Sequence, residues 1–276
     1  IADSGDQWEI TNRLLVIPQL QVSFEDRDII EKEDASIMRK LRLNYRGRNA
    51  YPMFRYIKPG CLMWFLEMEQ IPFLTHVLEQ TLDVTSRYQE DESLLYPDDV
   101  GDDEMYLLRV PSEQDGEITW TDEIRPIPQP ENHIIPVDID AEAFEALQDV
   151  VRVGNSVEID LFMTMMPVEE GRGKRPYFPF ALLIVDADSG MVLSHDVLSP
   201  LPTIDDMYSE VPQKVIDLLL GNNILPYEIY TQSPMLTAVL SPLFNDLDTP
   251  VVERPFLPML NEAKEAMLKH LGRGFN

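Results

Sequence analysis

The stretch Val157-Glu158-Ile159-Asp160-Leu161-Phe162-Met163 decides the fold, because its residues alternate as they do along a β-strand. The mostly apolar run Tyr177–Val185 is typical of a central strand that is covered on both faces. Asp186-Ala187-Asp188-Ser189-Gly190 predicts a hairpin turn, after which Met191–Leu198 returns as the partner strand. The sequence therefore predicts a meander of three strands.

Helices alternate with strands after this meander. Pro234 follows Ser233, as the first residue of a helix often follows its cap, and Pro242 should end or kink that helix. The predicted elements are, in order, a helix at 206–220, a strand at 227–231, a helix capped by Ser233, a strand at 249–253 and a final helix opened by Pro255. This order predicts a mixed five-stranded sheet with helices packed on it.

The N-terminal half contains a second recognisable unit. Tyr51–Ile57 is predicted to be a strand, Lys58–Gly60 a turn, and Cys61–Leu66 a second strand that returns beside the first. A helix begins at about Ile71, with Pro72 in its first turn, where a missing N–H costs nothing.

Apolar residues at helical spacing predict that one face of this helix is buried. They are Phe73, Leu74, Val77, Leu78 and Leu82. Met105–Val110 and Ile118–Ile124 predict two more strands after the helix. We therefore expect a mixed α+β arrangement in this half as well.

Composition marks the boundaries between the parts. Residues 89–104 are densely acidic and predict a mobile loop, and four prolines within 126–139 predict a stiff linker. Asp140 is placed to cap a short helix that follows the linker. We expect an α+β protein with an N-terminal domain at 1–125, the linker at 126–139 and a C-terminal domain at 140–276.

The charge is strongly negative and unevenly distributed. The chain has 49 acidic and 22 basic residues, a formal net charge of −27, which disfavours nucleic acid as a partner because polyanions are repelled. Residues 39–58 nevertheless contain seven cations and no acid, interleaved with Tyr45, Tyr51 and Tyr56. Two interpretations stay open: the segment binds an anion or a partner, or it lies against the acidic loop of its own chain.

Several classes of protein have no signature in the sequence. Cys61 is the one cysteine, so an intrachain disulfide and a cysteine zinc cluster are excluded, and we expect a cytoplasmic protein. No apolar run is long enough to span a bilayer. The four histidines lack the spacing of a zinc site, and the glycine-rich nucleotide motifs do not occur.

The element order of residues 155–271 resembles the ribonuclease H-like fold of ribonucleases H, integrases and transposases. The resemblance implies paired divalent metals, with Asp160 at the position of the first carboxylate and Glu262 or Glu265 at that of the third. The position of the second carboxylate is occupied by Gln232, which brings no charge to a hard cation. Residues 175–190 separately resemble a bacterial family known only as a domain of unknown function. In members of that family a second domain of unknown function lies N-terminal to the first.

These observations lead to two hypotheses. The first is a non-catalytic binding or protein-interaction protein without a cofactor, which would contact its partner through the basic segment or through the acidic loop. Its candidate partner- or anion-binding residues are Arg42, Arg46, Arg48, Arg55 and Lys58. The alternative is a divalent-metal-dependent nuclease or related phosphoryl-transfer enzyme. It would use Asp160 with Glu262 or Glu265 and Mg²⁺ or Mn²⁺. Under the first hypothesis we expect Asp160 to be an outward-facing strand carboxylate and both glutamates to lie on a solvated helix face.

Overall fold

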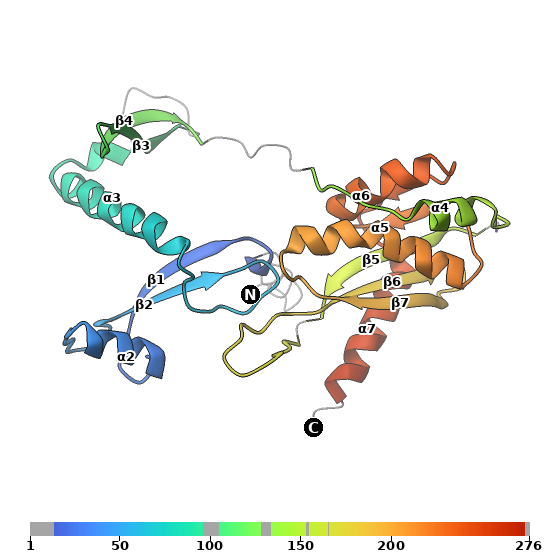
Figure 1. Ribbon diagram of the computed structural model, residues 1–276, viewed down its shortest axis with the longest axis horizontal. Coiled ribbons are helices and arrows are strands. Elements are labelled where there is room, and N and C mark those ends of the chain that lie inside the picture. The colour runs from blue at the N-terminus through green and yellow to red at the C-terminus, as the bar shows by residue number, and fades with distance from the viewer. Residues whose placement is uncertain (1–13, 96–104, 128–133, 153–154, 165, 274–276) are drawn as a thin grey trace. The chain divides into compact units, whose positions relative to one another are not determined.

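The computed structural model describes residues 14–95, 105–127, 134–152, 155–164 and 166–273 (Figure 1). Its packing divides the chain into two compact units, a larger one of residues 1–64 with 134–276 and a smaller one of residues 65–133. These divisions differ from the boundaries predicted at 125/126 and 139/140. The N-terminal segment groups with the C-terminal half because the two are joined by backbone hydrogen bonds, described below.

A mixed five-stranded sheet forms the centre of the larger unit, as predicted. Its order is β7-β6-β5-β8-β9. The first three strands in the chain pair antiparallel, and β8 and β9 run parallel to β5. The bounds are β5 Val157–Met163, β6 Phe180–Asp186, β7 Val192–Leu198, β8 Ile229–Thr231 and β9 Val251–Glu253.

Helices cover both faces of this sheet. The odd-numbered residues of β5 pack into the main apolar core with the buried sides of α4, α5 and α6, whereas Phe162 packs on the other face with α7. Glu158 and Asp160 therefore also project toward α7, because successive side chains of a strand alternate between faces. The bounds are α4 Ala141–Gln148, α5 Ile204–Gly221, α6 Pro234–Asn245 and α7 Pro258–Arg273.

Local sequence signals mark the starts of α4 and α6 but not the end of α6. The Asp140 and Ser233 side chains accept hydrogen bonds from the backbone of the first turns of α4 and α6, which confirms both predicted caps. Pro242 was predicted to end or kink its helix; it does not end it, because α6 continues to Asn245, and the kink stays a prediction. Pro242 lies in the last turn, where it removes one hydrogen bond, and the buried Phe244 holds that turn against the core.

The N-terminal part of the larger unit is a two-stranded sheet with one helix. β1 (Gln19–Glu25) pairs antiparallel with β2 (Tyr51–Ile57), and α2 (Lys32–Lys40) lies between them in the chain. The prediction that Cys61–Leu66 is the partner of β2 was wrong, because only Trp64 pairs with it, through Tyr56. The sequence of β1, Gln-Leu-Gln-Val-Ser-Phe-Glu, alternates polar and apolar residues, and that signal could have identified it.

A short backbone pairing joins this part to the C-terminal half. Phe178 N donates to Gly60 O at 2.8 Å, and Leu62 N donates to Pro176 O at 2.9 Å. Gly60 has φ +74°, in the left-handed region, and a Cβ at this position would lie 2.6 Å from Pro200 Cβ. Only glycine fits this junction without displacement of its neighbours.

The smaller unit consists of one long helix and one hairpin. α3 (Gln70–Glu90) and a 3₁₀ helix, η1 (Glu92–Leu95), precede β3 (Met105–Gln114), which pairs antiparallel with β4 (Glu117–Pro126). Both predicted strands are confirmed, and both are longer than predicted. Part of the predicted acidic loop is helical, since it includes the end of α3 and η1, and residues 96–104 lie outside the described residues. Residues 128–133 of the predicted linker also lie outside them, and 134–139 have no regular secondary structure.

The predicted buried face of α3 was wrong. Of its five apolar residues only Leu74 is buried, and Phe73, Val77 and Leu82 are exposed. The hairpin of the same unit packs instead on the side of α3 that carries His76, Gln80, Asp83 and Arg87.

Candidate functional site

The carboxylate of Asp160 lies in the interior of the larger unit. The residue is 6% exposed, and its Oδ2 atom lies 3.3 Å from the Lys264 ammonium of α7. The same ammonium lies 4.3 Å from the centre of the Phe162 ring, an attractive cation–π geometry. The expectation of an outward-facing carboxylate was therefore wrong. A lysine supplies the positive charge beside Asp160.

Glu158, two residues earlier on the same face of the sheet, also contacts α7. It is 2% exposed, and its Oε2 atom accepts a 2.6 Å hydrogen bond from the backbone N–H of Leu260. Leu260 is the third residue of α7, so this N–H has no acceptor within the helix, and a carboxylate there is favoured by the helix dipole. Glu158 and Asp160 together attach α7 to the sheet.

The other predicted metal ligands are not arranged with this pair around an ion. Glu262 and Glu265 are exposed on α7, as expected for a solvated helix face. Gln232 donates from Nε2 to the carbonyl of Pro255 at 2.9 Å. Among the described residues, no group of three or more His, Cys, Asp or Glu side chains is arranged to hold a metal ion. The arrangement around Asp160 suits a structural ion pair.

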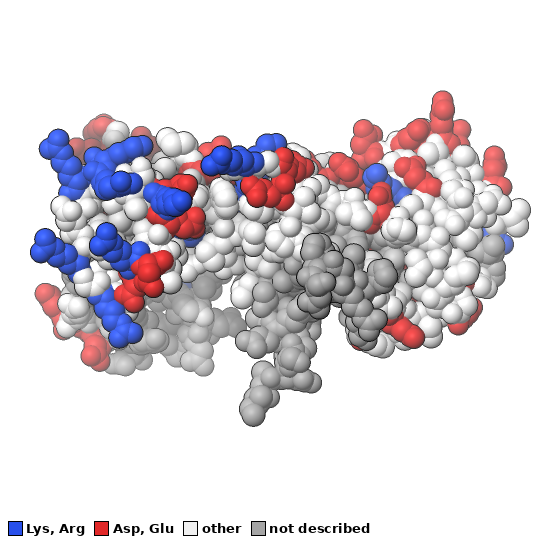
Figure 2. All heavy atoms as spheres, turned by 90° about the horizontal axis from the view of Figure 1, so that it is seen from below, with Lys and Arg blue, Asp and Glu red and all other residues white. Residues whose placement is uncertain are grey.

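A group of exposed cations surrounds the end of α2 and the segment that follows it. We define the basic surface as Arg39, Lys40, Arg42, Arg46 and Arg48, all of which are exposed. In Figure 2 basic side chains gather at the end of the view where α2 lies. Arg48 approaches Asp26 at 4.0 Å. Within the part of the chain that the structure describes, no ion pair is recorded for the other four.

Two of the predicted cations lie apart from this surface. Arg55 is buried and forms two hydrogen bonds to the Asp34 carboxylate, at 3.0 and 2.7 Å, and one to Glu31 at 3.1 Å. The hydrogen bond to Asp34 raises the pKa of the Arg55 guanidinium. Lys58 is half-buried. Arg55 is thus a structural residue, and its pairing with an acid 21 residues away could not be read from a segment without acids.

The tyrosines between these cations do not expose their rings for stacking with bases. Tyr45, Tyr51 and Tyr56 are all half-buried. The Tyr51 hydroxyl donates to the Tyr45 carbonyl, and the two rings meet edge to face at 6.0 Å. The Arg175 guanidinium lies 4.8 Å above the Tyr56 ring. Exposed aliphatic residues lie beside the cations, Ile37, Leu41 and Leu43, and the exposed aromatic residues of this part, Phe24 and Phe54, lie on β1 and β2.

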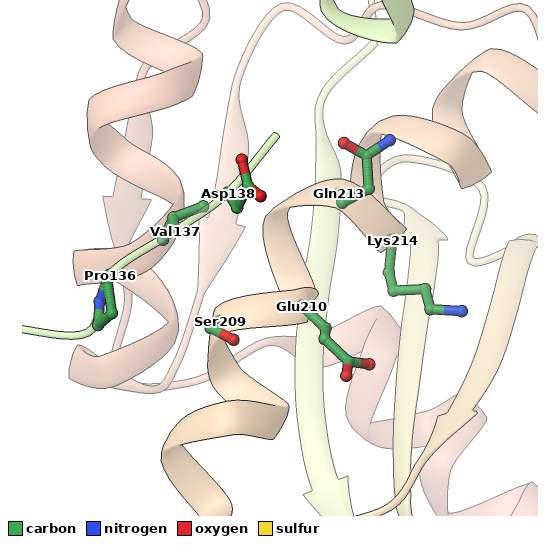
Figure 3. A pocket seen from close by; sticks show the side chains of 7 residues that line it. All are labelled: Pro136, Val137, Asp138, Ser209, Glu210, Gln213 and Lys214. Carbon is green, nitrogen blue, oxygen red and sulfur yellow. The ribbon is translucent and has the colours of Figure 1, made fainter. Parts of the chain in front are cut away.

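A hollow of about 430 Å³ lies between residues 136–138 and α5 (Figure 3). Its polar side chains are largely engaged within the protein. Lys214 pairs with Asp196 at 3.2 Å, Gln213 accepts from the backbone of Asp140, and the Ser209 hydroxyl donates to a carbonyl of its own helix. The hollow therefore lacks an activated nucleophile and its base.

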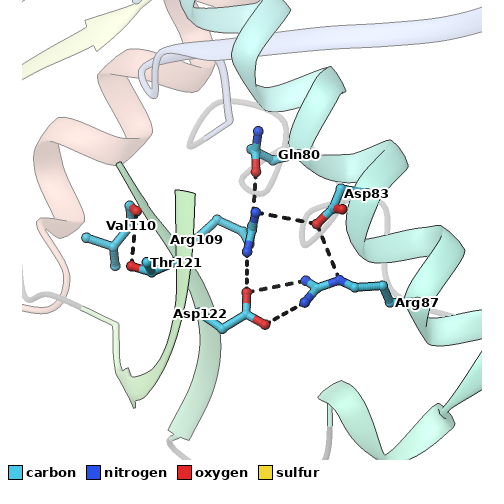
Figure 4. A network of polar contacts seen from close by, with 7 residues as sticks. All are labelled: Gln80, Asp83, Arg87, Arg109, Val110, Thr121 and Asp122. Atoms are coloured by element: carbon cyan, nitrogen blue, oxygen red, sulfur yellow. Dashed lines mark hydrogen bonds and ion pairs between the residues drawn. The ribbon is translucent and has the colours of Figure 1, made fainter. Parts of the chain in front are cut away.

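The smaller unit contains a closed ring of alternating charges, which we call the charge ring (Figure 4). Arg87 of α3 binds both carboxylate oxygens of Asp122 of β4, at 2.6 and 3.3 Å, and approaches Asp83 at 3.3 Å. Arg109 of β3 binds Asp122 and approaches Asp83 at 3.4 Å. The hydrogen bond from Arg87, and then that from Arg109, lower the pKa of Asp122. The ring ties the helix to both strands and uses both arginines of the acidic region.

Comparisons with known proteins divide the chain differently from the two compact units, because one of the two matched regions covers parts of both units. No match among curated proteins was found. Among the described residues, none of the helices is long and apolar enough to span a bilayer. Residues 3–109 match the model described as Domain of unknown function (DUF7309), and residues 144–268 match Domain of unknown function (DUF6930). The chain therefore combines two domains of unknown function, DUF7309 in its N-terminal half and DUF6930 over the five-stranded sheet.

Proposed function

We propose that this is a non-catalytic protein-interaction protein whose basic surface binds an acidic segment of a partner protein. The observation that carries the proposal is the concentration of five exposed cations within residues 39–48 of a chain with a net charge of −27. Charges in solution that lack a partner within the molecule retain their attraction for one outside it. Lys40, Arg42 and Arg46 are such charges within the described residues.

The chemistry of this surface favours a protein partner over a nucleic acid. Proteins that bind single strands stack bases on exposed aromatic rings, whereas the tyrosines here are half-buried. Exposed Ile37, Leu41 and Leu43 offer aliphatic contacts between the cations instead. A long polyanion also meets the repulsion of the whole chain, while a short acidic segment interacts mainly within the screening length of about 8 Å.

The proposal is tested by fluorescence anisotropy with a labelled peptide of alternating glutamate and leucine. We expect binding that weakens at least tenfold in Arg42→Glu/Arg46→Glu, since two attractive charges become repulsive. Arg172→Glu is the control, because Arg172 is an exposed cation outside the surface. Equal weakening in the control, or none in the double variant, would contradict the proposal.

We also propose that the C-terminal half has a ribonuclease H-like fold without nuclease activity. The strand order and the parallel pairing of β8 and β9 support the fold. The contact between Asp160 and Lys264 supports the loss of activity, since the ammonium stands beside the carboxylate that would bind a cation. The alternative, a Mg²⁺- or Mn²⁺-dependent nuclease using Asp160 with Glu262 or Glu265, rests on the same strand order. Nuclease activity that disappears in Asp160→Asn would overturn the non-catalytic proposal.

A further inference from the structure

One face of the β1–β2 sheet is apolar and partly exposed to solvent. It consists of three cross-strand pairs, whose directly opposite members point to the same side: Leu20–Tyr56, Val22–Phe54 and Phe24–Pro52. We call the three members on β1, Leu20, Val22 and Phe24, the edge residues. α2 packs on the opposite face, where Asp34 binds Arg55. Phe24 is 62% exposed and Phe54 is 36% exposed, so two aromatic side chains of the apolar face remain in contact with water.

The backbone of the edge residues points away from β2. Tyr56 N donates to Trp64 O at 2.8 Å and Trp64 N donates to Tyr56 O at 3.0 Å, so the polar groups of Tyr56 point away from β1. Because this direction alternates along an antiparallel pair, the residues opposite Tyr56, Phe54 and Pro52 direct their N–H and C=O groups to the outer edge of β1. Pro52 fits this register, since it has no N–H to donate. Within the described part of the chain, β1 pairs with β2 alone.

The outer edge of the five-stranded sheet at β7 is protected in a way that β1 is not. Val197 N donates to the Asp196 carboxylate at 2.8 Å, and the same carboxylate lies 3.2 Å from the Lys214 ammonium. The register of β7 on β6 also shifts between Ile184 and Val185. Charges and bulges of this kind prevent an edge strand from pairing with another chain. The register of β1 is unbroken, and its sequence, Gln-Leu-Gln-Val-Ser-Phe-Glu, contains neither lysine nor proline, so its edge can accept a further strand.

The basic surface adjoins one end of this edge. Asp26 directly follows β1, and its carboxylate accepts a 2.7 Å hydrogen bond from Asn49 N and lies 4.0 Å from Arg48 Nε. Arg48 therefore lies at the end of β1, and Arg46 is two residues away in the chain. An extended segment advances about 3.3 Å per residue, so a segment of about ten residues covers β1 and continues for about 10 Å beyond it. That continuation brings its side chains to the basic surface.

We propose that the acidic segment of the partner binds in an extended conformation as a third strand on the free edge of β1. The acidic charge of the segment rests on the proposed function, whereas its conformation rests on the geometry of β1. Its backbone pairs with the edge residues, its apolar side chains cover Phe24 and Phe54, and its carboxylates approach Arg48. A second copy of the chain is a poorer occupant, because two molecules that each carry a net charge of −27 repel each other.

The first test uses the full chain and the labelled peptide of alternating glutamate and leucine. Val22→Pro removes an outward N–H and no hydrogen bond to β2, and it should weaken binding about tenfold or more, because one hydrogen bond is lost and the proline ring obstructs the peptide. Val22→Thr is the matched control, since it keeps the N–H and a β-branched side chain, and its binding should equal that of the wild type. Circular dichroism verifies that both variants are folded.

A pair of modified peptides provides a second test, which needs no variant of the protein. Successive N–H groups of an extended strand point to opposite edges, so only one set of alternate residues faces β1. We expect N-methylation of all leucines or of all glutamates to abolish binding in one peptide and to preserve it in the other. Amide exchange measured by NMR should slow at the edge residues and stay unchanged at Gln21 and Ser23, whose N–H groups already face β2. Equal effects of the two methylated peptides would overturn the proposal.

Strand addition and the role of the basic surface can fail separately. Weaker binding by Arg42→Glu/Arg46→Glu together with unchanged binding by Val22→Pro would overturn strand addition and leave the proposed function standing. Weaker binding by Val22→Pro alone would support strand addition and contradict the basic surface. A wild-type dimer in sedimentation that Val22→Pro abolishes would assign the edge to a second copy of the chain, and absence of binding by the wild type would overturn both proposals.

Discussion

Substitution of Gly60 by alanine should destabilise the larger unit by about 2–5 kcal/mol. Adoption of φ +74° costs a residue with a Cβ about 1–2 kcal/mol. The new Cβ would also lie 2.6 Å from Pro200 Cβ and 2.9 Å from its Cγ, and overpacking of this kind costs about 1–3 kcal/mol. The proline ring is rigid and close to the backbone, so the conflict can be relieved only by movement of the chain.

The assay is urea unfolding followed by tryptophan fluorescence and circular dichroism. Gly173→Ala is a matched control, because Gly173 has φ +79° and a Cβ at that position would meet no atom within 4 Å. In the control, the free energy of unfolding should fall only by the cost of the left-handed backbone conformation, about 1–2 kcal/mol. Equal losses in the two variants would refute the steric reasoning, and a wild-type midpoint for Gly60→Ala would refute both parts of it.

Three further predictions concern charged groups. Lys264→Met should cost about 3 kcal/mol in urea unfolding, since it leaves the Asp160 carboxylate buried without its cation, and Asp160→Leu in the same chain should restore most of that loss. The hydrogen bond from the Ser189 hydroxyl is the main reason that the pKa of Asp186 falls from 3.8 to about 2. The ionised Asp186 carboxylate therefore stabilises the fold fully above about pH 3.8, and this stabilisation is lost as the pH falls through 2. Ser189→Ala should therefore raise the pKa of Asp186, as measured by a carbon-13 NMR titration. The variant should have a lower free energy of unfolding than the wild type at pH 6, and this difference should shrink as the pH falls toward 2. A difference that does not depend on pH would contradict this prediction. Asp122→Asn should destabilise the smaller unit by about 1 kcal/mol, since the contacts of Asp122 are exposed to solvent, and accelerate hydrogen exchange in β3 and β4 with no change in β5.

The sequence predicted the elements of the five-stranded sheet well because their signals are local. The alternation along β5 and the turn before β7 each depend on neighbouring residues. The role of Asp160 could not be predicted in this way. Its cation, Lys264, is 104 residues away, and nothing near the strand indicates that the two meet. Arg55 and Asp34 illustrate the same limit over 21 residues.

The error on α3 has a different physical origin. Periodicity correctly grouped Phe73, Val77 and Leu82 as apolar residues of one helix, but it carries no information on what covers them. The side that packs on the hairpin is specified by Arg87 and Arg109, the only two cations among fourteen acids between residues 83 and 123. Their isolation in the sequence was visible, and their pairing within one ring was not.

The junction at Gly60 also has a consequence for biosynthesis. A ribosome delivers β1, β2 and the Gly60–Leu62 segment early, whereas their hydrogen-bonding partners at Pro176 and Phe178 emerge more than a hundred residues later. At 5–20 residues per second this delay is on the order of ten seconds. The whole of residues 65–133 is translated during that interval, so the nascent chain must keep its first sheet competent for docking while an intervening module is already complete.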